Sequence, residues 1–507
     1  MLLMLVTSIL ASSVIVVFHI LNDFLLRRRA PSGSRIPPMP PANSMRGHTE
    51  IVRSDFDRNK FLQWTKEYGP VVRLRMHFRN IVLLNNYDSM KKFCNVKELL
   101  WRPANFLGSR DLYLGLLSLN GEPWSENRKF CLRMLRDVGF AKTASNDRLM
   151  EEAARLVEEF GKTGGEPVDA NQYLIPCAFN NIASFFYGSQ VPHDHPSRRE
   201  LNQVLLRVST AVKVGLNYRF YPSFLRELMA QLPFTRNGRL NKAFKELDAV
   251  SEKQVELYKA AKCGDETKDF INAYLKKIEE CKTDGNPFFT DHYLVGNINS
   301  FLLGGTFSTT ISINMHLINF AKHHDTLQAR AQQEIDDVVG RDRLPTWDDH
   351  TQLPFILACV WEVFRWQQFS ALGTPRECVE DVVIDDYFIP KGTVVYPNIW
   401  AVNHDPKYWK DPAKFDPGRY LNEDGSIIAP KPEYLVTFSV GRRACPGEMF
   451  ATVEIFLAIT HLLQKYRILL EKPLEYDLDS LETQLLRING IKLRFLPRQA
   501  EDSSKTN

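Results

Sequence analysis

The sequence predicts a mainly α fold with small β-sheets, and three observations support this class. Long segments carry apolar residues at helical spacing, at 124–160, 198–215, 238–262, 291–322 and 325–339. β-branched runs such as VVRLRM and NIVLL fall between about residue 50 and residue 97, and a second β-rich stretch covers 374–396. The pattern turns helical again after Gly447 and ends in the strand-like RINGIKLRFL. Because 507 residues exceed what one compact core usually holds, we expect two lobes or one unusually large helical domain.

The composition is that of an ordinary folded protein, with 44% hydrophobic and 24% charged residues. A net charge of +4 is too small to indicate a nucleic-acid partner. The eight cysteines are scattered without the spacing of a zinc site, which is typical of free thiols in a reducing compartment. We expect most of them, including Cys94, Cys177 and Cys359, to be small buried hydrophobes.

The first 26 residues form a mostly apolar run that is about as long as a bilayer-spanning helix requires. Arg27, Arg28 and Arg29 follow this run, whereas a cleaved signal peptide carries its positive charge before the apolar stretch. The cluster also favours a cytoplasmic location for everything after it. We therefore predict an uncleaved membrane anchor at residues 1–26.

Three further regions follow the anchor. Residues 27–43 combine the arginines with PSGSRIPPMPPAN, whose prolines predict an extended, stiff spacer. Residues 44–499 form the main folded domain, and 500–507 form a polar tail. Within the domain, residues 211–236 mix aromatic, arginine and proline residues. They are either a loop folded back on the core or a membrane-dipping lid over a substrate entrance.

Residues 436–449, VTFSVGRRACPGEM, place a lone cysteine in a tight loop. A thiolate serves as a nucleophile or as a metal ligand, and a helix N-terminus, nearby cations or the metal itself can lower its pKa. A helix is predicted to begin directly after Cys445, with its positive dipole end toward the sulfur. A nucleophile would need a histidine partner, and none is identifiable from the sequence.

The loop also has the spacing FxxGxRxCxG, which resembles the haem-binding loop of the cytochrome P450 family of haem-thiolate monooxygenases. Its fixed residues are Phe438, Gly441, Arg443, Cys445 and Gly447. The resemblance implies haem b with Cys445 as the axial ligand of iron, glycines that let the backbone approach the porphyrin, and Arg443 near a haem propionate. This family is itself the general example of thiolate-ligated haem, in which the sulfur favours O–O cleavage.

A second motif is Glu362 and Arg365 in WEVFR, an i,i+3 pair on one helical face. The apolar flanks ILACVWEVF indicate that this pair is buried and needs another partner. The family resemblance supplies one, because FDPGRY at 415–420 resembles its Pro-x-Arg-Phe/Tyr element and makes Arg419 the third member. We interpret the three residues as a structural network that holds the segment before the cysteine loop.

Trp124 and Arg128 in EPWSENR stand four residues apart on a predicted helix, and two such donors suit a carboxylate. The resemblance implies that they contact haem propionates, together with Arg376 in GTPREC and Arg102 in WRPANF. The alternative is a stacked Trp/Arg pair on the surface.

Residues 301–310, FLLGGTFSTT, depart from the family pattern of an acid followed by threonine over the distal face of the haem. Gly304 and its neighbour suggest a close approach to the backbone, with dioxygen and substrate as candidates. Phe307 occupies the acidic position and cannot carry a proton, whereas Ser308 keeps a hydroxyl at the threonine position. Alternatively, that hydroxyl bonds back to the Gly304 carbonyl. The catalytic residues that the resemblance implies are Gly305, Ser308 and Thr309.

Four cations lie near these motifs, namely Lys129, Arg133, Arg136 and Arg442. The default interpretation is a scattered solvated face. In the resembling family an acidic flavoprotein reductase docks on the cysteine side, and local positive potential would steer that encounter. The resemblance therefore implies an NADPH-dependent reductase, and a cytochrome b5-type donor, as partners at this face.

The motifs occur in the family order along nearly the whole chain and look most like the microsomal animal branch that contains drug, steroid and insect-hormone oxidisers. The resemblance implies a triangular two-lobed single domain, anchored in the endoplasmic reticulum membrane, that inserts one atom of dioxygen into a lipophilic substrate by hydroxylation or epoxidation, using NADPH electrons. Two alternatives stay open: a haem-thiolate isomerase or dehydratase that needs no dioxygen, and a non-catalytic haem-binding membrane protein. We expect a largely apolar substrate pocket built from residues 103–119, 211–236, 297–309 and 367–374.

Overall fold

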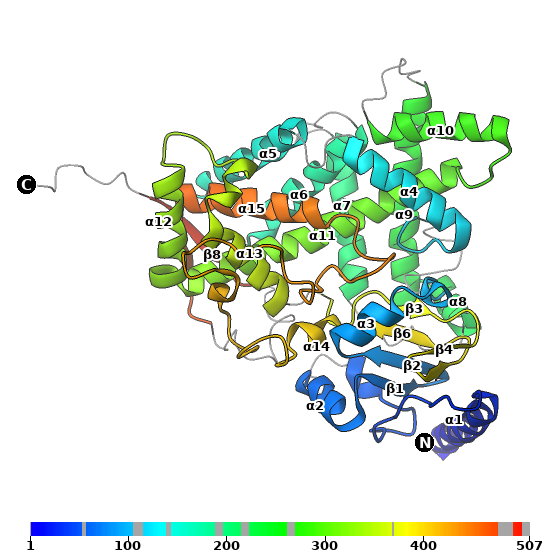
Figure 1. Ribbon diagram of the computed structural model, residues 1–507. Helices are drawn as coiled ribbons and strands as arrows, with labels where there is room; N and C mark the ends of the chain where they lie inside the picture. Colours follow the sequence, from blue (N-terminus) through cyan, green and yellow to red (C-terminus); the bar gives the residue numbers. More distant parts are fainter. Residues whose placement is uncertain are drawn as a thin grey trace, which may run out of the picture.

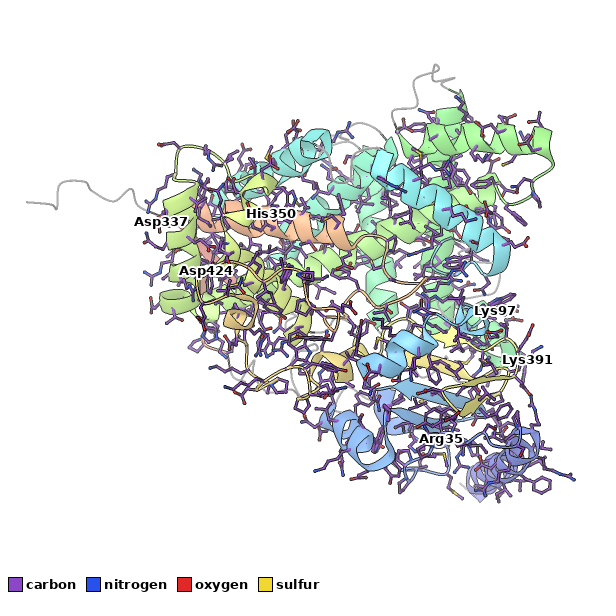
Figure 2. All side chains as sticks on the ribbon, in the orientation of Figure 1. Arg35, Lys97, Asp337, His350, Lys391 and Asp424 are labelled. Atoms are coloured by element: carbon purple, nitrogen blue, oxygen red, sulfur yellow. The ribbon has the colours of Figure 1, made fainter. Side chains whose placement is uncertain are left out.

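The computed structural model describes residues 2–52, 57–104, 115–137, 143–187, 196–213, 223–260, 269–367, 370–474 and 490–498. It is mainly helical with small sheets, as the sequence predicts, and most of the helices gather in one lobe while the four-stranded sheet lies in the other beside the N-terminal helices (Figure 1). Exposed charged side chains such as Arg35, Lys391, Asp337 and Asp424 lie around the edges of both lobes (Figure 2).

The helices match most of the predicted segments. Their bounds are α1 (Leu2–Arg29), α2 (Asn59–Tyr68), α3 (Tyr87–Phe93), α4 (Gly121–Asp137), α5 (Thr143–Gly161), α6 (Asn171–Tyr187), α7 (Pro196–Lys213), α8 (Ser223–Gln231), α9 (Arg236–Ala260), α10 (Phe270–Asp284), α11 (Asp291–Lys322), α12 (Ala329–Val338), α13 (Pro354–Trp366), α14 (Ile399–Asn403) and α15 (Glu448–Lys465). The predicted segment 291–322 coincides with α11, because the Thr290 side chain caps its first turn by accepting from the Tyr293 amide.

Some predicted boundaries were wrong. The single helix expected over 124–160 is two helices, α4 and α5, and the intervening residues 138–142 lie outside the description. Residues 223–231, expected in a loop or lid, form α8. Helix α6 was not predicted, because Pro176 lies inside it and its sequence is apolar on most faces, which hides the helical period.

The main sheet joins the two β-rich stretches of the sequence. Strands β1 (Val71–Met76), β2 (Arg79–Leu84), β6 (Val394–Pro397) and β3 (Arg376–Glu377) run in the order β1-β2-β6-β3. The β2–β6 pair is parallel and the other two pairs are antiparallel. This pairing carries Arg376 from the edge strand into the interior, where it is buried. Smaller pairs are β4 (Val382–Ile384) with β5 (Tyr387–Ile389) and β7 (Tyr466–Leu470) with β8 (Leu493–Pro497).

Helix α11 passes through the middle of the helical lobe and packs against α6, α9 and α15 (Figure 1). Its contact with α6 explains one of the paired glycines, because a Cβ on Gly305 would come within 2.5 Å of the Ile182 side chain. Gly304 has nothing within 4 Å of its Cβ position. A close approach is therefore made at Gly305 by the neighbouring helix α6, and the approach of dioxygen or substrate to these glycines stays a prediction.

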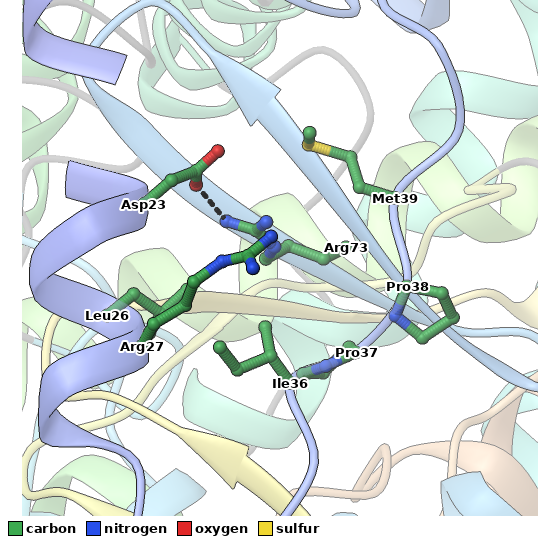
Figure 3. Close-up of a pocket in the computed structure, with 8 residues that line it drawn as sticks. All are labelled: Asp23, Leu26, Arg27, Ile36, Pro37, Pro38, Met39 and Arg73. Atoms are coloured by element: carbon green, nitrogen blue, oxygen red, sulfur yellow. Dashed lines mark hydrogen bonds and ion pairs between the residues drawn. The ribbon is translucent and has the colours of Figure 1, made fainter. Parts of the chain in front are cut away.

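Helix α1 is docked against the sheet lobe. Asp23 binds Arg73 at 2.7 Å and Arg75 at 3.5 Å, and Arg29 binds both carboxylate oxygens of Asp381. Between α1, the proline-rich segment and β1 lies a pocket of 460 Å³ (Figure 3). Its lining comprises Asp23, Leu26, Arg27, Ile36, Pro37, Pro38, Met39 and Arg73. The described residues contain no helix with the length and apolarity needed to cross a membrane, so the anchor at 1–26 stays a prediction.

Candidate active site

The cysteine loop holds Cys445 at the foot of α15. The Cys445 amide donates to the Phe438 carbonyl at 2.9 Å, and the Gly447 amide donates to the Cys445 sulfur at 3.4 Å. Phe438 also packs its ring edge-on against Phe364, with 5.1 Å between centroids. Seven cysteines are described, all free, and Cys445 is the exposed one among them. The loop therefore presents one accessible sulfur at a helix N-terminus.

Positions 441 and 447 of the loop differ in how strictly their surroundings require a glycine. Gly441 has a φ of +77°, and a Cβ there would come within 2.7 Å of the Cys94 carbonyl oxygen, so a glycine is required. Gly447 lies just before α15, and a Cβ there would make only an ordinary contact with the Cys445 sulfur. The Cys94 carbonyl thus gives Gly441 a steric reason within the protein, and the approach of both glycines to a porphyrin, which the family resemblance implies, stays a prediction.

The polypeptide by itself does not lower the pKa of Cys445. Desolvation by neighbouring groups raises the pKa of this thiol above its ordinary value, and the Glu448 carboxylate raises it further. The Gly447 amide and the Arg128 guanidinium act in the opposite direction. Of the three influences that could lower this pKa, the helix N-terminus and the nearby cation are outweighed by desolvation, and a metal cation at the sulfur would favour the thiolate.

Four arginines converge near this loop without any carboxylate. Arg102, Arg376 and Arg443 are buried and Arg128 is half-buried, and none forms an ion pair with a described residue. Desolvation and mutual repulsion lower the pKa of Arg443 to about 7 and that of Arg102 to about 9. Such an excess of buried positive charge is costly unless an anion joins it.

The arginines are fixed by backbone carbonyls. Arg443 donates to Leu100 at 2.7 Å and to Leu119 at 2.6 Å. Arg128 donates to the carbonyl of Ala444, next to the cysteine, at 2.7 Å. Arg376 reaches Cys94 at 2.7 Å and Val440 at 3.1 Å, and Arg102 reaches Pro375 at 2.8 Å.

Trp124 completes the cluster. It is 3% exposed, with the Arg443 guanidinium 3.8 Å from its ring centroid and that of Arg128 at 5.9 Å, so the alternative of a surface Trp/Arg pair was wrong. Among the described groups, its indole Nε1 and the Nε of Arg376 are buried donors without an acceptor. Orphaned donors among uncompensated guanidinium groups fit the two propionates of a haem, and the exposed sulfur of Cys445 fits its iron.

The distal candidates lie on α11. The Ser308 hydroxyl donates to the Gly304 carbonyl, as the alternative interpretation of this residue expected. Thr309 is 2% exposed, whereas Phe307 is half-buried and packs against the helical core. Gly304 is exposed and has no atom within 4 Å of its Cβ position, and its neighbours Leu303 and Gly305 are half-buried. This turn offers hydroxyl groups and no acid.

The structure brings Glu362, Arg365 and Arg419 together. Glu362 and Arg365 are fully buried and joined by two hydrogen bonds of 2.7 and 2.8 Å, and Arg419 reaches the same carboxylate at 3.1 Å. Arg365 also donates to the carbonyls of Asn403 at 3.0 Å and Pro412 at 2.8 Å. The network therefore holds the chain that leads to the cysteine loop.

The four cations suggested as a docking face are exposed. Lys129, Arg133 and Arg136 follow one another at spacings of four and three residues along α4, so they share one side of that helix. Lys129 is paired with Glu126 at 2.7 Å. Arg442 lies in the cysteine loop itself, with its guanidinium 5.9 Å from the Trp124 ring centroid.

Sequence reasoning missed several polar residues of the site. Asn120 accepts from the Arg102 amide at 2.7 Å and from Arg443 at 3.1 Å. Asn297 on α11 reaches the site through the Leu116 amide, and Glu454 on α15 is a further buried polar residue that bonds Asn181 on α6, outside the site. A lone charge in the apolar run of α15 was the available signal for Glu454. Of the expected substrate pocket, residues 105–114, 214–222 and 368–369 lie outside the description.

Comparison with known proteins gives a consistent result. The cytochrome P450 family model matches residues 37–495. Cytochrome P450 2H1 of Gallus gallus is 31% identical over 458 residues, covering 86% of this chain and 89% of that protein. Cytochrome P450 2G1 of Oryctolagus cuniculus is 30% identical, covering 89% and 90%. Cytochrome P450 2C8 of Homo sapiens is also 30% identical, covering 91% and 93%.

Proposed function

The chain belongs to the cytochrome P450 family, and from this premise we propose that Cys445 is the axial ligand of its haem iron. As a member of this family it is a haem-thiolate monooxygenase that works with a redox partner on lipophilic substrates. The observation that carries the assignment is the exposed sulfur just before α15, beside four arginines that form no ion pair with any described carboxylate. In this proposal the haem propionates accept hydrogen bonds from Trp124, Arg102, Arg128, Arg376 and Arg443.

The haem, when bound, supplies the oxygen chemistry, and the thiolate tunes it. The chain itself holds the haem, excludes water from the site and moves protons. We propose that Ser308 and Thr309 carry the proton-handling role on α11, because Phe307 offers no acid. The Ser308 hydroxyl donates to the Gly304 carbonyl and its oxygen can accept a hydrogen bond from water. To relay a proton, the hydroxyl would turn away from this carbonyl and give up its own hydrogen as it receives one from the water.

We propose that an NADPH-dependent flavoprotein reductase docks on the face formed by Lys129, Arg133, Arg136 and Arg442, and that a cytochrome b5-type donor shares it. Exposed cations beside the cysteine loop support this, because positive potential speeds the approach of an acidic partner. Reduction of the haem by the reductase should slow in the charge-reversal variant Arg133→Glu and at high salt. If the rate of reduction depended on salt in Arg133→Glu as it does in the wild type, the docking face would lie elsewhere.

We also propose the predicted division into an anchor at 1–26, a spacer at 27–43, the catalytic domain at 44–499 and a polar tail, with the protein held at the endoplasmic reticulum membrane. Exposed apolar residues support contact with lipid: Phe224 and Leu228 on α8 and Phe234 beyond it are 71%, 54% and 74% exposed. Flotation of the full chain with lipid vesicles tests this, and Phe224→Ser with Phe234→Ser should reduce the bound fraction.

The iron ligand is tested directly by Cys445→Ala. The reduced carbon-monoxide complex of the wild type should show the spectrum of a thiolate-ligated haem, and the variant should not. Cys281→Ala is the matched control, since Cys281 is a buried cysteine on α10, away from the loop. A thiolate spectrum that survives in Cys445→Ala would overturn the assignment.

Phe307 favours one alternative reaction, a rearrangement of an oxygenated substrate that needs neither dioxygen nor a proton relay. The reaction class is tested with reductase, NADPH, a lipophilic extract and isotopically heavy dioxygen. Heavy oxygen in an organic product is expected. Turnover of a hydroperoxide without reductase, and without heavy oxygen in the product, would favour the isomerase instead.

A further inference from the structure

The segment from Gly115 to Asn120 lies directly on α11, on the way from the sheet lobe to α4. A Cβ on Gly115 would overlap the backbone carbonyl of Gly296 and the hydroxyl of Ser300. This closeness lets the backbone amides of the segment reach side chains of α11. The Leu116 amide donates to Asn297 Oδ1 at 3.0 Å, and the Leu117 amide lies 3.4 Å from Ser300 Oγ.

The opposite edge of the same segment faces the arginines. The Leu116 carbonyl accepts from Arg443 at 3.3 Å, and the Leu119 carbonyl accepts from Arg443 at 2.6 Å. The Leu117 carbonyl accepts from Arg102 at 3.3 Å. The segment thus joins α11 on its amide side to two of the proposed propionate-binding guanidinium groups on its carbonyl side.

Asn297 is held rigidly at the α11 end of this bridge. Its Nδ2 donates to Asn127 Oδ1 at 2.8 Å, and the Tyr274 hydroxyl donates to the same oxygen. Asn127 in turn donates to the carbonyls of Pro123 at 2.9 Å and Phe288 at 2.7 Å. Asn127, Asn297 and Tyr274 are each 0% exposed. A buried network with these partners leaves Asn297 one orientation.

We propose that Asn297 is a positioning residue that sets where Arg443 and Arg102 stand relative to α11, by fixing the segment whose carbonyls receive them. The inference rests on the proposed function, in which these arginines hold the haem propionates. Loss of Asn297 leaves the Leu116 amide buried without its acceptor, so the segment shifts to find another partner and takes the carbonyls with it. Haem retention is then affected beyond any general loss of stability.

Asn297→Leu is the test, with Asn299→Leu as its matched control. Both residues are asparagines of α11 that are 0% exposed, but Asn299 bonds Asp248 at 2.7 Å and Ser251 at 2.6 Å on α9, away from the bridge. The rate of haem transfer from each holoenzyme to excess apomyoglobin is measured beside its midpoint of urea unfolding. We expect haem transfer to be about tenfold faster in Asn297→Leu than in the wild type. This is the lower end of the range of effects seen when a residue that supports a ligand-binding group is lost. Asn299→Leu should unfold at lower urea with transfer within about twofold of the wild type.

Asn297→Asp separates an effect on the position of the segment from an effect on the stability of the fold. It is also the test to use if Asn297→Leu fails to fold. It keeps the acceptor for the Leu116 amide but sets a carboxylate against Asn127 Oδ1. Stability should fall while haem transfer stays near the wild-type rate. The inference would be overturned if haem transfer were accelerated equally in Asn297→Leu and Asn299→Leu. It would also be overturned if haem transfer in Asn297→Asp were accelerated in proportion to the loss of stability of that variant. A wild type that lacks the thiolate-haem spectrum would instead overturn the proposed function.

Discussion

Glu454→Gln should make the protein more stable at alkaline pH. Glu454 lies on α15, is 2% exposed, and accepts from the Asn181 amide at 2.8 Å through Oε1. Glu454 Oε2 and Asn181 Oδ1 are buried atoms without a hydrogen-bond partner among the described groups. A proton on the carboxyl would let it donate to such an acceptor. Desolvation, together with the nearby Glu152 carboxylate, raises the pKa of Glu454 from 4.5 to about 8.

The sign and size follow from this pKa. Between pH 4.5 and about 8 the folded protein holds a proton at Glu454 that the unfolded chain releases, so stability falls as pH rises through this window. Each pKa unit corresponds to about 1.4 kcal/mol, so the full window costs up to about 5 kcal/mol. Below pH 4.5 Glu454 does not reduce the free energy of unfolding, and above about pH 8 the reduction has reached its full size.

Glutamine has the shape of the protonated acid and cannot ionise. Urea unfolding of the holoenzyme, measured at several pH values from about 5 to about 9, should show a weaker fall of the unfolding free energy in Glu454→Gln than in the wild type. Glu423→Gln, which removes an exposed carboxyl, should keep the wild-type slope. Parallel slopes for the wild type and Glu454→Gln would refute the reasoning.

Three further predictions concern the loop, the buried network and the distal helix. Gly441→Ala should lower the unfolding free energy by about 1–3 kcal/mol and weaken haem retention, because φ is +77° and the Cys94 carbonyl blocks a Cβ. Gly425→Ala, with a φ of +84° but open space around it, should retain haem normally, and equal haem loss in both would refute the steric argument. Arg365→Met leaves the buried Glu362 carboxylate with Arg419 as its one cationic partner among the described residues, beside the Asp416 amide, so urea unfolding should show a loss of about 3–5 kcal/mol; a loss below about 1 kcal/mol would contradict it. Ser308→Ala should lower product formed per NADPH, with peroxide released instead, while Ser308→Thr should keep the wild-type ratio; an unchanged ratio in Ser308→Ala would exclude this hydroxyl from proton handling.

Local patterns in the sequence predicted the parts of the fold that depend on local chemistry. The bounds of α11 were predictable because Thr290 caps its first turn and a long, mostly apolar run without proline follows. The cysteine loop was identifiable because its residues are contiguous, and Glu362 with Arg365 because they share a helical turn. Helix α6 escaped because Pro176 lies inside it, and a proline is the usual signal for the end of a helix.

Long-range contacts were not predictable in the same way. Nothing adjacent to Gly305 in sequence shows that Ile182, more than a hundred residues earlier, takes the space beside it. The bonds from Arg443 to Leu119 and from Leu116 to Asn297 likewise join distant segments through backbone groups, which leave no mark in the residue type. The raised pKa of the Cys445 thiol depends on desolvation by folded neighbours, so a motif alone suggested the opposite direction.

The docking of α1 has a practical consequence for anyone who shortens this protein. A chain that starts after residue 29 loses Asp23, which is the ion-pair partner of both Arg73 and Arg75 on β1, and loses the Phe18 ring, which packs edge-on against Phe78 at 5.2 Å. The cut would therefore uncover a basic and aromatic surface on the sheet. A protein shortened in this way exposes that surface, so its tendency to associate reflects the truncation and not the native molecule.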